Sequence, residues 1–150
     1  MHDFKRLGTV ANHTGGAGAD SLTGGTGDDD FVIGDGDTGI TVATADTIAD
    51  FGTGANELGL GTAGDATAGT GNYVEAVAAV QDFAAALTAA NTALSTLSDT
   101  TNSNTEIYAF EFDANNGYLF EDTDVDGAAD QVVVLTGIND TGIEAADIIA

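Results

Sequence analysis

Four aspartates near the carboxyl end of the chain alternate with other residues in a pattern suited to binding a metal ion. The run is D-x-D-x-D-G-x-x-D over residues 122–130. It offers carboxylates at positions 1, 3, 5 and 9, a backbone carbonyl at position 7, and a glycine at position 6 for a sharp turn. Calcium accepts six to eight oxygens in a tolerant geometry, so this run can wrap one calcium ion. The predicted ligands are Asp122, Asp124, Asp126, the carbonyl of Ala128, and Asp130.

The flanking sequence predicts that this loop joins two strands. An EF-hand would have a glutamate at position 12, where this chain has Val133, and would be flanked by helices. Here the flanks are 118–120 and 131–135, which have the character of strands. The alternative is an acidic hairpin tip kept polar for solubility. Against that alternative, three aspartates at alternate positions repel one another when no cation is present.

A second group of acids lies in a nine-residue repeat. The copies are 15–23 and 24–32, with a weaker third copy at 33–41. The pattern G-G-x-G-x-D-x-U-x is that of the calcium-binding parallel β-roll, in which two repeats make one turn and glycine loops stack along each edge. Glycine permits the tight turn and lets backbone carbonyls face an ion held between stacked loops. The candidate ligands are Gly15, Gly16, Gly18, Asp20, Gly24, Gly25, Gly27, Asp29, Gly34, Asp35, Gly36 and Asp37.

Each copy also carries one large apolar residue that is expected to point inward. These residues are Leu22, Phe31 and Ile40, spaced nine apart. A flexible glycine linker, the alternative, would not keep that spacing. The third copy has Thr38 where aspartate is expected, although its loop still offers Asp35 and Asp37.

The repeat resembles that of the RTX family, bacterial proteins exported by type I secretion. Residues 46–60 are similar to the segment that closes the roll in serralysin-type C-terminal domains, roughly D-x-I-x-D-F-x-x-G-x-D-x-I-x-L, with Asn56 in place of the last aspartate. Asp46 is a further candidate ligand, expected to be the partner of Asp29 on the stacked loop. The tail 144–150 resembles the uncleaved export signal of these proteins. The alternative for the tail is a final edge strand or half-turn that buries Ile148 and Ile149.

Composition excludes several classes of function. The 150 residues include 25 acids and two bases, Lys5 and Arg6, for a net charge of −23. Such a chain lacks the basic surface that nucleic-acid binding needs, and it would be repelled by an anionic membrane. It has no cysteine, only His2 and His13 as histidines, no apolar run long enough to span a membrane, and no apolar core of an N-terminal signal. No catalytic constellation is present, so we expect no enzymatic activity. High-salt adaptation is an alternative explanation of the charge.

Apolar periodicity predicts one long helix over 73–97. Its apolar stripe is expected to pack into the core, and the alternative is that the stripe binds a partner. Asn72 is its expected cap, with Glu75 completing a capping box, although the first part of the segment could instead be a strand. Residues 61–72 and 98–104 are expected to be loops. Residues 105–136 predict a β-hairpin with a tight turn at 115–117. In its first strand, alternation places Tyr108, Phe110 and Phe112 on one face and Ile107, Ala109 and Glu111 on the other. The helical stripe consists of Val74, Val77, Val80, Phe83, Leu87, Ala90, Leu94 and Leu97.

Together these patterns predict a mainly β fold, with a short parallel β-roll followed by a β-rich domain that has one long helix. The expected divisions are an unassigned segment at 1–14, the calcium-binding roll at 15–60, and a C-terminal domain at 61–150. The resemblance implies a secreted calcium-binding module that folds on extracellular calcium and is exported by an ABC transporter. The alternative function is a calcium module that binds a cell surface, an S-layer or a polysaccharide.

Overall fold

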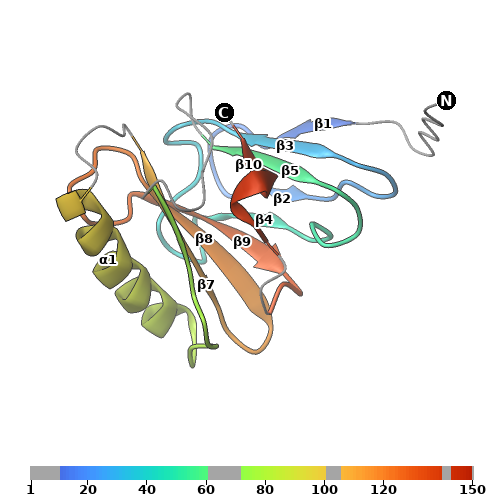
Figure 1. Cartoon of the computed structure of the whole chain (residues 1–150). Helices are drawn as coiled ribbons and strands as arrows, with labels where there is room; N and C mark the ends of the chain where they lie inside the picture. Colours follow the sequence, from blue (N-terminus) through green and yellow to red (C-terminus); the bar gives the residue numbers. More distant parts are fainter. Residues whose placement is uncertain (1–10, 61–71, 101–105, 140–142, 150) are drawn as a thin grey trace, which may run out of the picture.

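The computed structural model describes residues 11–60, 72–100, 106–139 and 143–149 (Figure 1). Residues 61–71 of the predicted 61–72 loop and residues 101–104 of the predicted 98–104 loop lie outside these ranges, and residues 98–100 belong to the helix instead of the predicted loop. The described residues form one helix, α1 (Phe83–Thr100), a 3-10 turn, η1 (Ala145–Asp147), and short strands. The strands are β1 (Asn12–Thr14), β2 (Ser21–Leu22), β3 (Asp30–Ile33), β4 (Asp46–Ile48), β5 (Glu57–Leu60), β6 (Tyr73–Glu75), β7 (Ile107–Phe112), β8 (Asn116–Asp122), β9 (Gln131–Thr136) and β10 (Ile148–Ile149).

The strands build two sheets, and the chain passes from one to the other along its N-terminal half. The outer sheet has the order β1-β3-β5-β10, and the central sheet has the order β2-β4-β9-β8-β7-β6. β1 pairs in parallel with β3, so that Asn12 lies opposite Asp30, two repeat lengths later. β2 pairs in parallel with β4 in the other sheet. The fold is therefore mainly β, with two sheets and one helix, as the sequence predicts.

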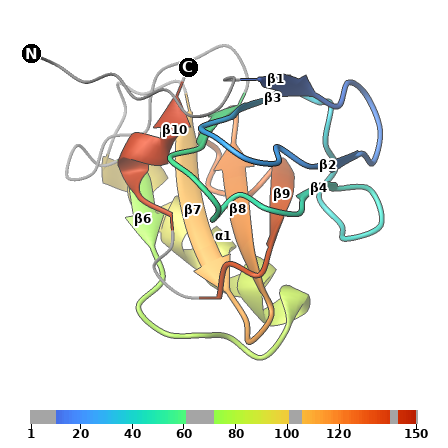
Figure 2. The same cartoon turned by 90° about the vertical axis from the view of Figure 1, so that its right-hand side faces the viewer.

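Both sheets combine strands from the repeat segment with strands from the C-terminal half. β4 pairs in parallel with β9, which continues through β8 and β7 as an antiparallel ribbon. β10 pairs in parallel with β5, so Ile148 lies opposite Leu58 and is fully buried. The tail thus forms the edge strand that was one of the two interpretations of its sequence. Figure 2 shows β10 beside the outer sheet and β7, β8 and β9 crossing behind it.

Two apolar layers hold these parts together. The first lies between the two sheets and includes Phe31, Leu58 and Phe110. The second lies between the central sheet and α1 and includes Leu94 and Phe120. Strand β7 separates its side chains between the layers, with Tyr108, Phe110 and Phe112 in the first and Ile107 and Ala109 in the second. This alternation is the one predicted for residues 107–112.

Helix α1 starts ten residues later than the sequence predicts. Residues 73–75 form β6, which pairs in parallel with β7, so the strand alternative for this stretch is correct and the Asn72 cap is wrong. Val77, expected on the apolar stripe, is 99% exposed. The helix begins instead after Asp82, whose Oδ1 accepts a hydrogen bond from Ala85 N at 2.9 Å. From there Ala86, Ala90 and Leu94 recur at helical spacing and are fully buried against the central sheet. None of the helices in the described ranges has the length and apolar character needed to cross a bilayer.

The turn between β7 and β8 also differs from the prediction. Asn116 and Gly117 are not at the tip but already pair within the ribbon, with Gly117 opposite Phe112. Asp113 makes the turn: its Oδ1 accepts hydrogen bonds from Asn115 N at 2.7 Å and Asn116 N at 2.9 Å. Its Oδ2 accepts one from the hydroxyl of Tyr118 at 2.6 Å. Burial alone would raise the pKa of Asp113, but these three bonds together hold it below its ordinary value.

Asp113→Ala should lower the free energy of unfolding by about 1–2 kcal/mol, because it removes three hydrogen bonds and leaves a buried hydroxyl without its acceptor. Since the folded pKa of Asp113 is depressed, this contribution is present above the unfolded pKa and is lost as pH falls through the folded pKa. Urea denaturation of the two proteins should therefore give curves that differ at pH 7 and converge in strong acid. A difference that is the same at both pH values would contradict this role.

Candidate metal centres

The two clear repeat copies fold alike in their glycine turns. The second glycine has φ of 79° at Gly16 and 95° at Gly25, and the fourth position has φ of 120° at Gly18 and 128° at Gly27. L-residues rarely adopt such values, so the turn itself demands glycine at these four places. The matched backbone angles nine residues apart indicate that the repeat in the sequence is also a repeat in the structure.

The first glycine of each copy lies directly against the aspartate at the sixth position. A Cβ built on Gly15 would be 2.9 Å from Asp20 Cβ, and one on Gly24 would be 2.6 Å from Asp29 Oδ2. Each loop therefore folds back on its own carboxylate, and any side chain at the first position would push that carboxylate away. This arrangement brings each glycine turn and the carboxylate of the same copy into close contact.

The loops stack, but not in the register that the sequence suggested. Asp46 was expected beside Asp29; instead, its Oδ1 accepts a hydrogen bond from Asp20 N at 2.8 Å. Asp29 N donates to Asn56 Oδ1, also at 2.8 Å. The reason is the alternation between sheets: Asp46 opens β4, which pairs with β2, whereas Asp29 precedes β3, which pairs with β5.

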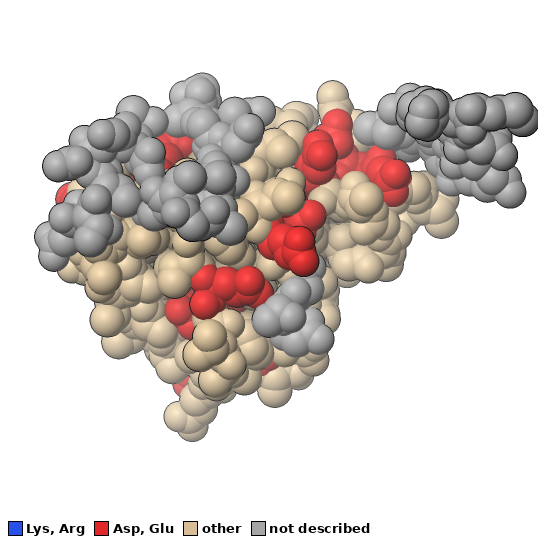
Figure 3. Space-filling view, viewed as in Figure 1, with Lys and Arg blue, Asp and Glu red and all other residues tan. Residues whose placement is uncertain are grey.

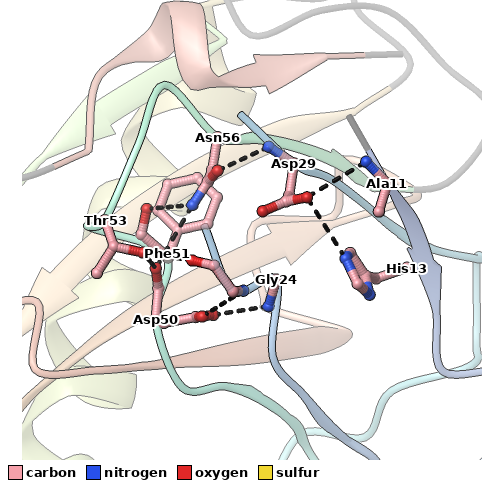
Figure 4. Close-up of polar contacts among 9 residues, drawn as sticks. Ala11, His13, Gly24, Asp29, Asp50, Phe51, Thr53 and Asn56 are labelled. Carbon is pink, nitrogen blue, oxygen red and sulfur yellow. Dashed lines mark hydrogen bonds and ion pairs between the residues drawn. The ribbon is translucent and has the colours of Figure 1, made fainter. Parts of the chain in front are cut away.

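Asp29 is held in the buried stack that Figure 4 shows. Its Oδ1 accepts from Ala11 N at 3.2 Å and lies 3.7 Å from His13 Nε2. Its Oδ2 is buried and has no hydrogen-bond partner. Asn56 has a structural role here, because its Nδ2 donates to the carbonyl of Phe51 at 2.8 Å.

Asp50 is a residue of this stack that the sequence did not single out as a ligand. Its two carboxylate oxygens accept from Gly24 N at 2.9 Å and from Gly25 N at 2.7 Å. The signal that could have found it is the spacing, since Asp46 is as far from Asp20 as Asp50 is from Gly24. Figure 4 shows the Asp50 carboxylate directed at the glycine turn.

The third repeat copy departs from the other two. No strand forms at 39–41, and Ile40 packs half-buried against the α1 layer rather than between the sheets. Thr38 is buried and links two strands: its hydroxyl donates to the carbonyl of Val132 and accepts from Asp46 N, both at 2.8 Å. Thr38 is thus a structural link, because its hydroxyl donates one hydrogen bond and accepts another.

The third loop nevertheless stacks on the first. Gly18 N donates to the carbonyl of Asp37 at 3.0 Å. Burial raises the pKa of Asp46, the amide of Asp20 lowers it, and the charges of Asp20 and Asp37 raise it again, for a net increase. Asp46 Oδ2 is buried without a hydrogen-bond partner. Asp46 therefore has one buried, unsatisfied oxygen close enough to Asp20 and Asp37 to feel their charges, and a bound cation would offset both costs. In the same loop a Cβ on Gly34 would be 2.5 Å from Asp37 Oδ2, and Gly36 has φ of 76°.

The loop between β8 and β9 brings together three of its four predicted carboxylate ligands. Carboxylate oxygens of Asp122, Asp124 and Asp130 all lie within 4.8 Å of one another. The carboxylate of Asp126 is outside this group and accepts from Ala128 N at 2.9 Å. The turn is sharp, with φ of 60° at Val125 and 92° at Gly127. The loop lies beside the helix, where Ala129 N donates to the side chain of Asn91.

The backbone shapes this loop around its acids. Gly127 N donates to Asp122 Oδ2 at 2.8 Å, and Asp126 N donates to the carboxylates of both Asp122 and Asp124 at 3.2 Å. Asp130 Oδ2 accepts from the amide and hydroxyl of Thr123. Burial raises the pKa of Asp122 despite these amide bonds, and the charge of Asp126 adds to the increase. A divalent cation would neutralise this group directly.

The described ranges contain no lysine or arginine that could balance these acids, because the two basic residues of this kind in the sequence are Lys5 and Arg6. On the face seen in Figure 3, acidic side chains gather in separate patches without a basic neighbour among the described residues. Comparisons with known proteins add no relationship: no protein-family model matches the chain, and no curated protein matches its sequence.

Proposed function

We propose that this chain is the calcium-binding C-terminal module of a bacterial RTX protein, that its repeat segment is a short β-roll, and that it folds on calcium after export by a type I secretion system. The observation that carries the proposal is the pair of unsatisfied, buried carboxylate oxygens, Asp29 Oδ2 and Asp46 Oδ2, one at each stack of glycine loops. A buried charged oxygen without a partner is costly, and a bound cation removes that cost.

The charge of the chain supports calcium-dependent folding. The net charge of the chain is −23, and folding brings together acids that the unfolded chain keeps apart. A cation that binds only the folded state shifts the equilibrium toward it. At the low calcium inside a cell the chain would stay unfolded, which leaves its C-terminal tail free for an ABC transporter. On folding, Ile148 becomes buried in the outer sheet, so the tail can act first as an export signal and then as a strand.

The polysaccharide or cell-surface alternative has less support. Binding to a glycan would be favoured by exposed aromatic rings beside acids on a sheet. No phenylalanine or tyrosine in the described ranges is exposed; those of β7 and β8 are buried in the two apolar layers. The acids are therefore better explained as calcium ligands than as part of a sugar-binding surface.

Calcium at millimolar concentration should order the chain, because extracellular calcium modules typically bind with dissociation constants of about 10⁻⁴–10⁻³ M. We expect circular dichroism to show a gain of β structure and a higher melting temperature with calcium, and a chelator to reverse both. Sodium chloride at matched ionic strength is the control. If salt alone reproduced the whole effect, screening would suffice and the acids would be a halophilic adaptation. Identical spectra and melting temperatures in all conditions would refute the proposal.

A further inference from the structure

The hairpin of β7 and β8 contains a chemically reactive pair of residues where its second strand begins. Asn116 is the only asparagine in the sequence that is followed by a glycine. In an unfolded chain, the backbone nitrogen of such a glycine can attack the side-chain amide carbon of the asparagine. Glycine favours this attack because it has no Cβ to hinder the approach and leaves the backbone free to rotate. Asn116 and Gly117 are therefore the pair most prone to this reaction in the chain.

The fold requires the glycine of this pair. A Cβ on Gly117 would lie 2.6 Å from Cε2 of Phe110 and 3.0 Å from the carbonyl oxygen of Ile138. The ring of Phe110 is fully buried in the apolar layer between the sheets, so it has no free space into which to move. Any other residue at 117 would displace a core side chain. The hairpin therefore cannot replace Gly117 by a residue that would slow the reaction.

The folded hairpin holds both residues away from the geometry of attack. Asn116 N donates to Asp113 Oδ1 at 2.9 Å, and the carbonyl of Asn116 accepts from Asp113 N, also at 2.9 Å. Gly117 pairs with Phe112 in β7 and with Leu135 in β9. Attack requires the backbone between 116 and 117 to rotate out of the extended conformation of β8, and that rotation would break these pairings. Folding therefore protects Asn116.

We propose that Asn116 is a site of spontaneous deamidation that is open in the unfolded chain and closed in the folded one. The nitrogen of Gly117 forms a bond to Cγ of Asn116, and the bond from Cγ to the side-chain nitrogen breaks. That nitrogen takes the proton of the Gly117 N–H and leaves as ammonia. Water then opens the resulting cyclic imide at one of its two carbonyls. The product is either aspartate on a normal backbone or isoaspartate, whose backbone runs through the former side chain.

Isoaspartate at 116 would change the spacing on which the hairpin depends. It adds one backbone atom, the former Cβ, between the turn at Asp113 and the pairing of Gly117 with its two neighbours. The register of a hairpin is fixed by the length of its turn, so the extra atom displaces the start of β8. The isoaspartyl chain should therefore fold less stably than the unmodified chain.

The new carboxyl group would also lack a donor that the amide supplies. Burial raises the pKa of Tyr118 to about 12, the bond to Asp113 adds to the increase, and hydrogen bonding by the Asn116 side chain opposes it. The hydroxyl of Tyr118 already donates to Asp113 Oδ2 at 2.6 Å. An ionised carboxyl at 116 only accepts hydrogen bonds, so it would compete with Asp113 for this one proton.

The reaction limits how long the chain can stay unfolded and still reach its native structure. In the proposed function the chain is unfolded at the low calcium inside a cell, so calcium-driven folding would also end its exposure to deamidation. This link to calcium rests on the proposed function. The protection of Asn116 by the folded hairpin does not depend on it.

Mass spectrometry of the full chain, with fragmentation to locate the modified residue, follows the conversion of amide to acid at mildly alkaline pH. Conversion at 116 should be at least about tenfold slower in the chain folded with saturating calcium than in urea, because a reaction of the open state follows the unfolded fraction. Circular dichroism verifies that each sample is folded or unfolded. Equal rates in the two samples would overturn the proposal.

Two variants compared in urea identify the reacting residue, and neither needs to fold. Asn116→Gln should lose the fast conversion, because the longer side chain of glutamine does not close the same ring. Asn115→Gln is the matched control, since Asn115 is followed by Asn116 and not by a glycine, and it should keep the full rate. Fast conversion that persists in Asn116→Gln would show that the reactive residue lies elsewhere.

The effect on stability is tested with a variant of the same charge. Asn116→Asp carries the carboxyl group on a normal backbone, whereas the isoaspartyl chain, isolated by ion exchange, carries it on the lengthened one. The isoaspartyl chain should unfold at a lower urea concentration than Asn116→Asp. The same midpoint for both would refute the role of the extra backbone atom.

A chelator without urea separates this inference from the proposed function. If calcium drives folding, the chelator should raise the rate of conversion at 116 toward its value in urea. Conversion that stays as slow with chelator as with calcium would mean that the chain folds without calcium. That result would overturn the proposed function and leave the protected deamidation site in place.

Discussion

Replacing Phe31 by alanine should lower the free energy of unfolding by about 3–5 kcal/mol, the range for truncating a fully buried aromatic side chain. Phe31 is 0% exposed and points between the two sheets from the middle of β3. Its ring stacks on His13, with centroids 5.2 Å apart, and lies 6.1 Å from the ring of Phe51. The cavity would therefore open where β3 meets His13 of β1 and Phe51 of the connection between β4 and β5.

The adjacent residue provides the control for that result. Val32 lies on the opposite face of β3 and is 39% exposed, so Val32→Ala should change the free energy of unfolding by no more than about 0.5 kcal/mol. Urea denaturation at saturating calcium compares the two. A larger loss for Val32→Ala than for Phe31→Ala would mean that β3 is shifted by one residue and shows its other face to the core.

The parts of the fold that could be predicted are those whose signal is local and periodic. The nine-residue spacing of Leu22 and Phe31 placed both beside the core between the sheets, and the two-residue alternation in 107–112 placed its side chains correctly in the two layers. In β3 one face is buried and the other is more exposed, so the hydrophobic pattern specifies which side chains point inward. In β7 both faces are buried, and the alternation of side chains along a strand divides them between the two layers.

The parts that could not be predicted depend on pairing between distant segments. Nothing in the sequence of 131–136 says that it pairs with β4, or that this pairing needs Thr38 to bridge Asp46 and Val132. The start of α1 was missed because apolar residues at 74, 77 and 80 continue its period. That stretch instead begins with β6, which pairs with β7 as an edge strand, and tertiary pairing overrides a weak helical preference.

The candidate metal centres show the same difference between contacts within one segment and contacts between distant segments. Within one loop, spacing predicted that Asp122, Asp124 and Asp130 would meet, because those residues are close in the chain. Between loops, the expected meeting of Asp46 with Asp29 was wrong, because it depends on which of two sheets each strand joins.

Asp124→Ala should remove one bound calcium from the chain and leave the ions of the repeat loops in place. At a calcium concentration 100 times the dissociation constant, loss of one site lowers the free energy of unfolding by about 2.7 kcal/mol. Calorimetric titration would count the ions, and urea denaturation would measure the stability. Glu57→Gln, which removes an exposed acid outside the 122–130 loop, is the control and should lose no ion from that loop.

Removing calcium should reverse the order of stability of the unmodified chain and the Asp124→Ala variant. In the presence of a chelator, three carboxylates whose oxygens lie within 4.8 Å of one another repel, and Asp124→Ala removes one of them. The variant should then be as stable as the unmodified chain or more stable, although it is less stable when calcium is present. An aspartate that only shaped the turn would cost the variant stability in both conditions, because its bond from Asp126 N does not depend on calcium. The change of sign between the two conditions therefore separates a calcium ligand from a structural aspartate at this position.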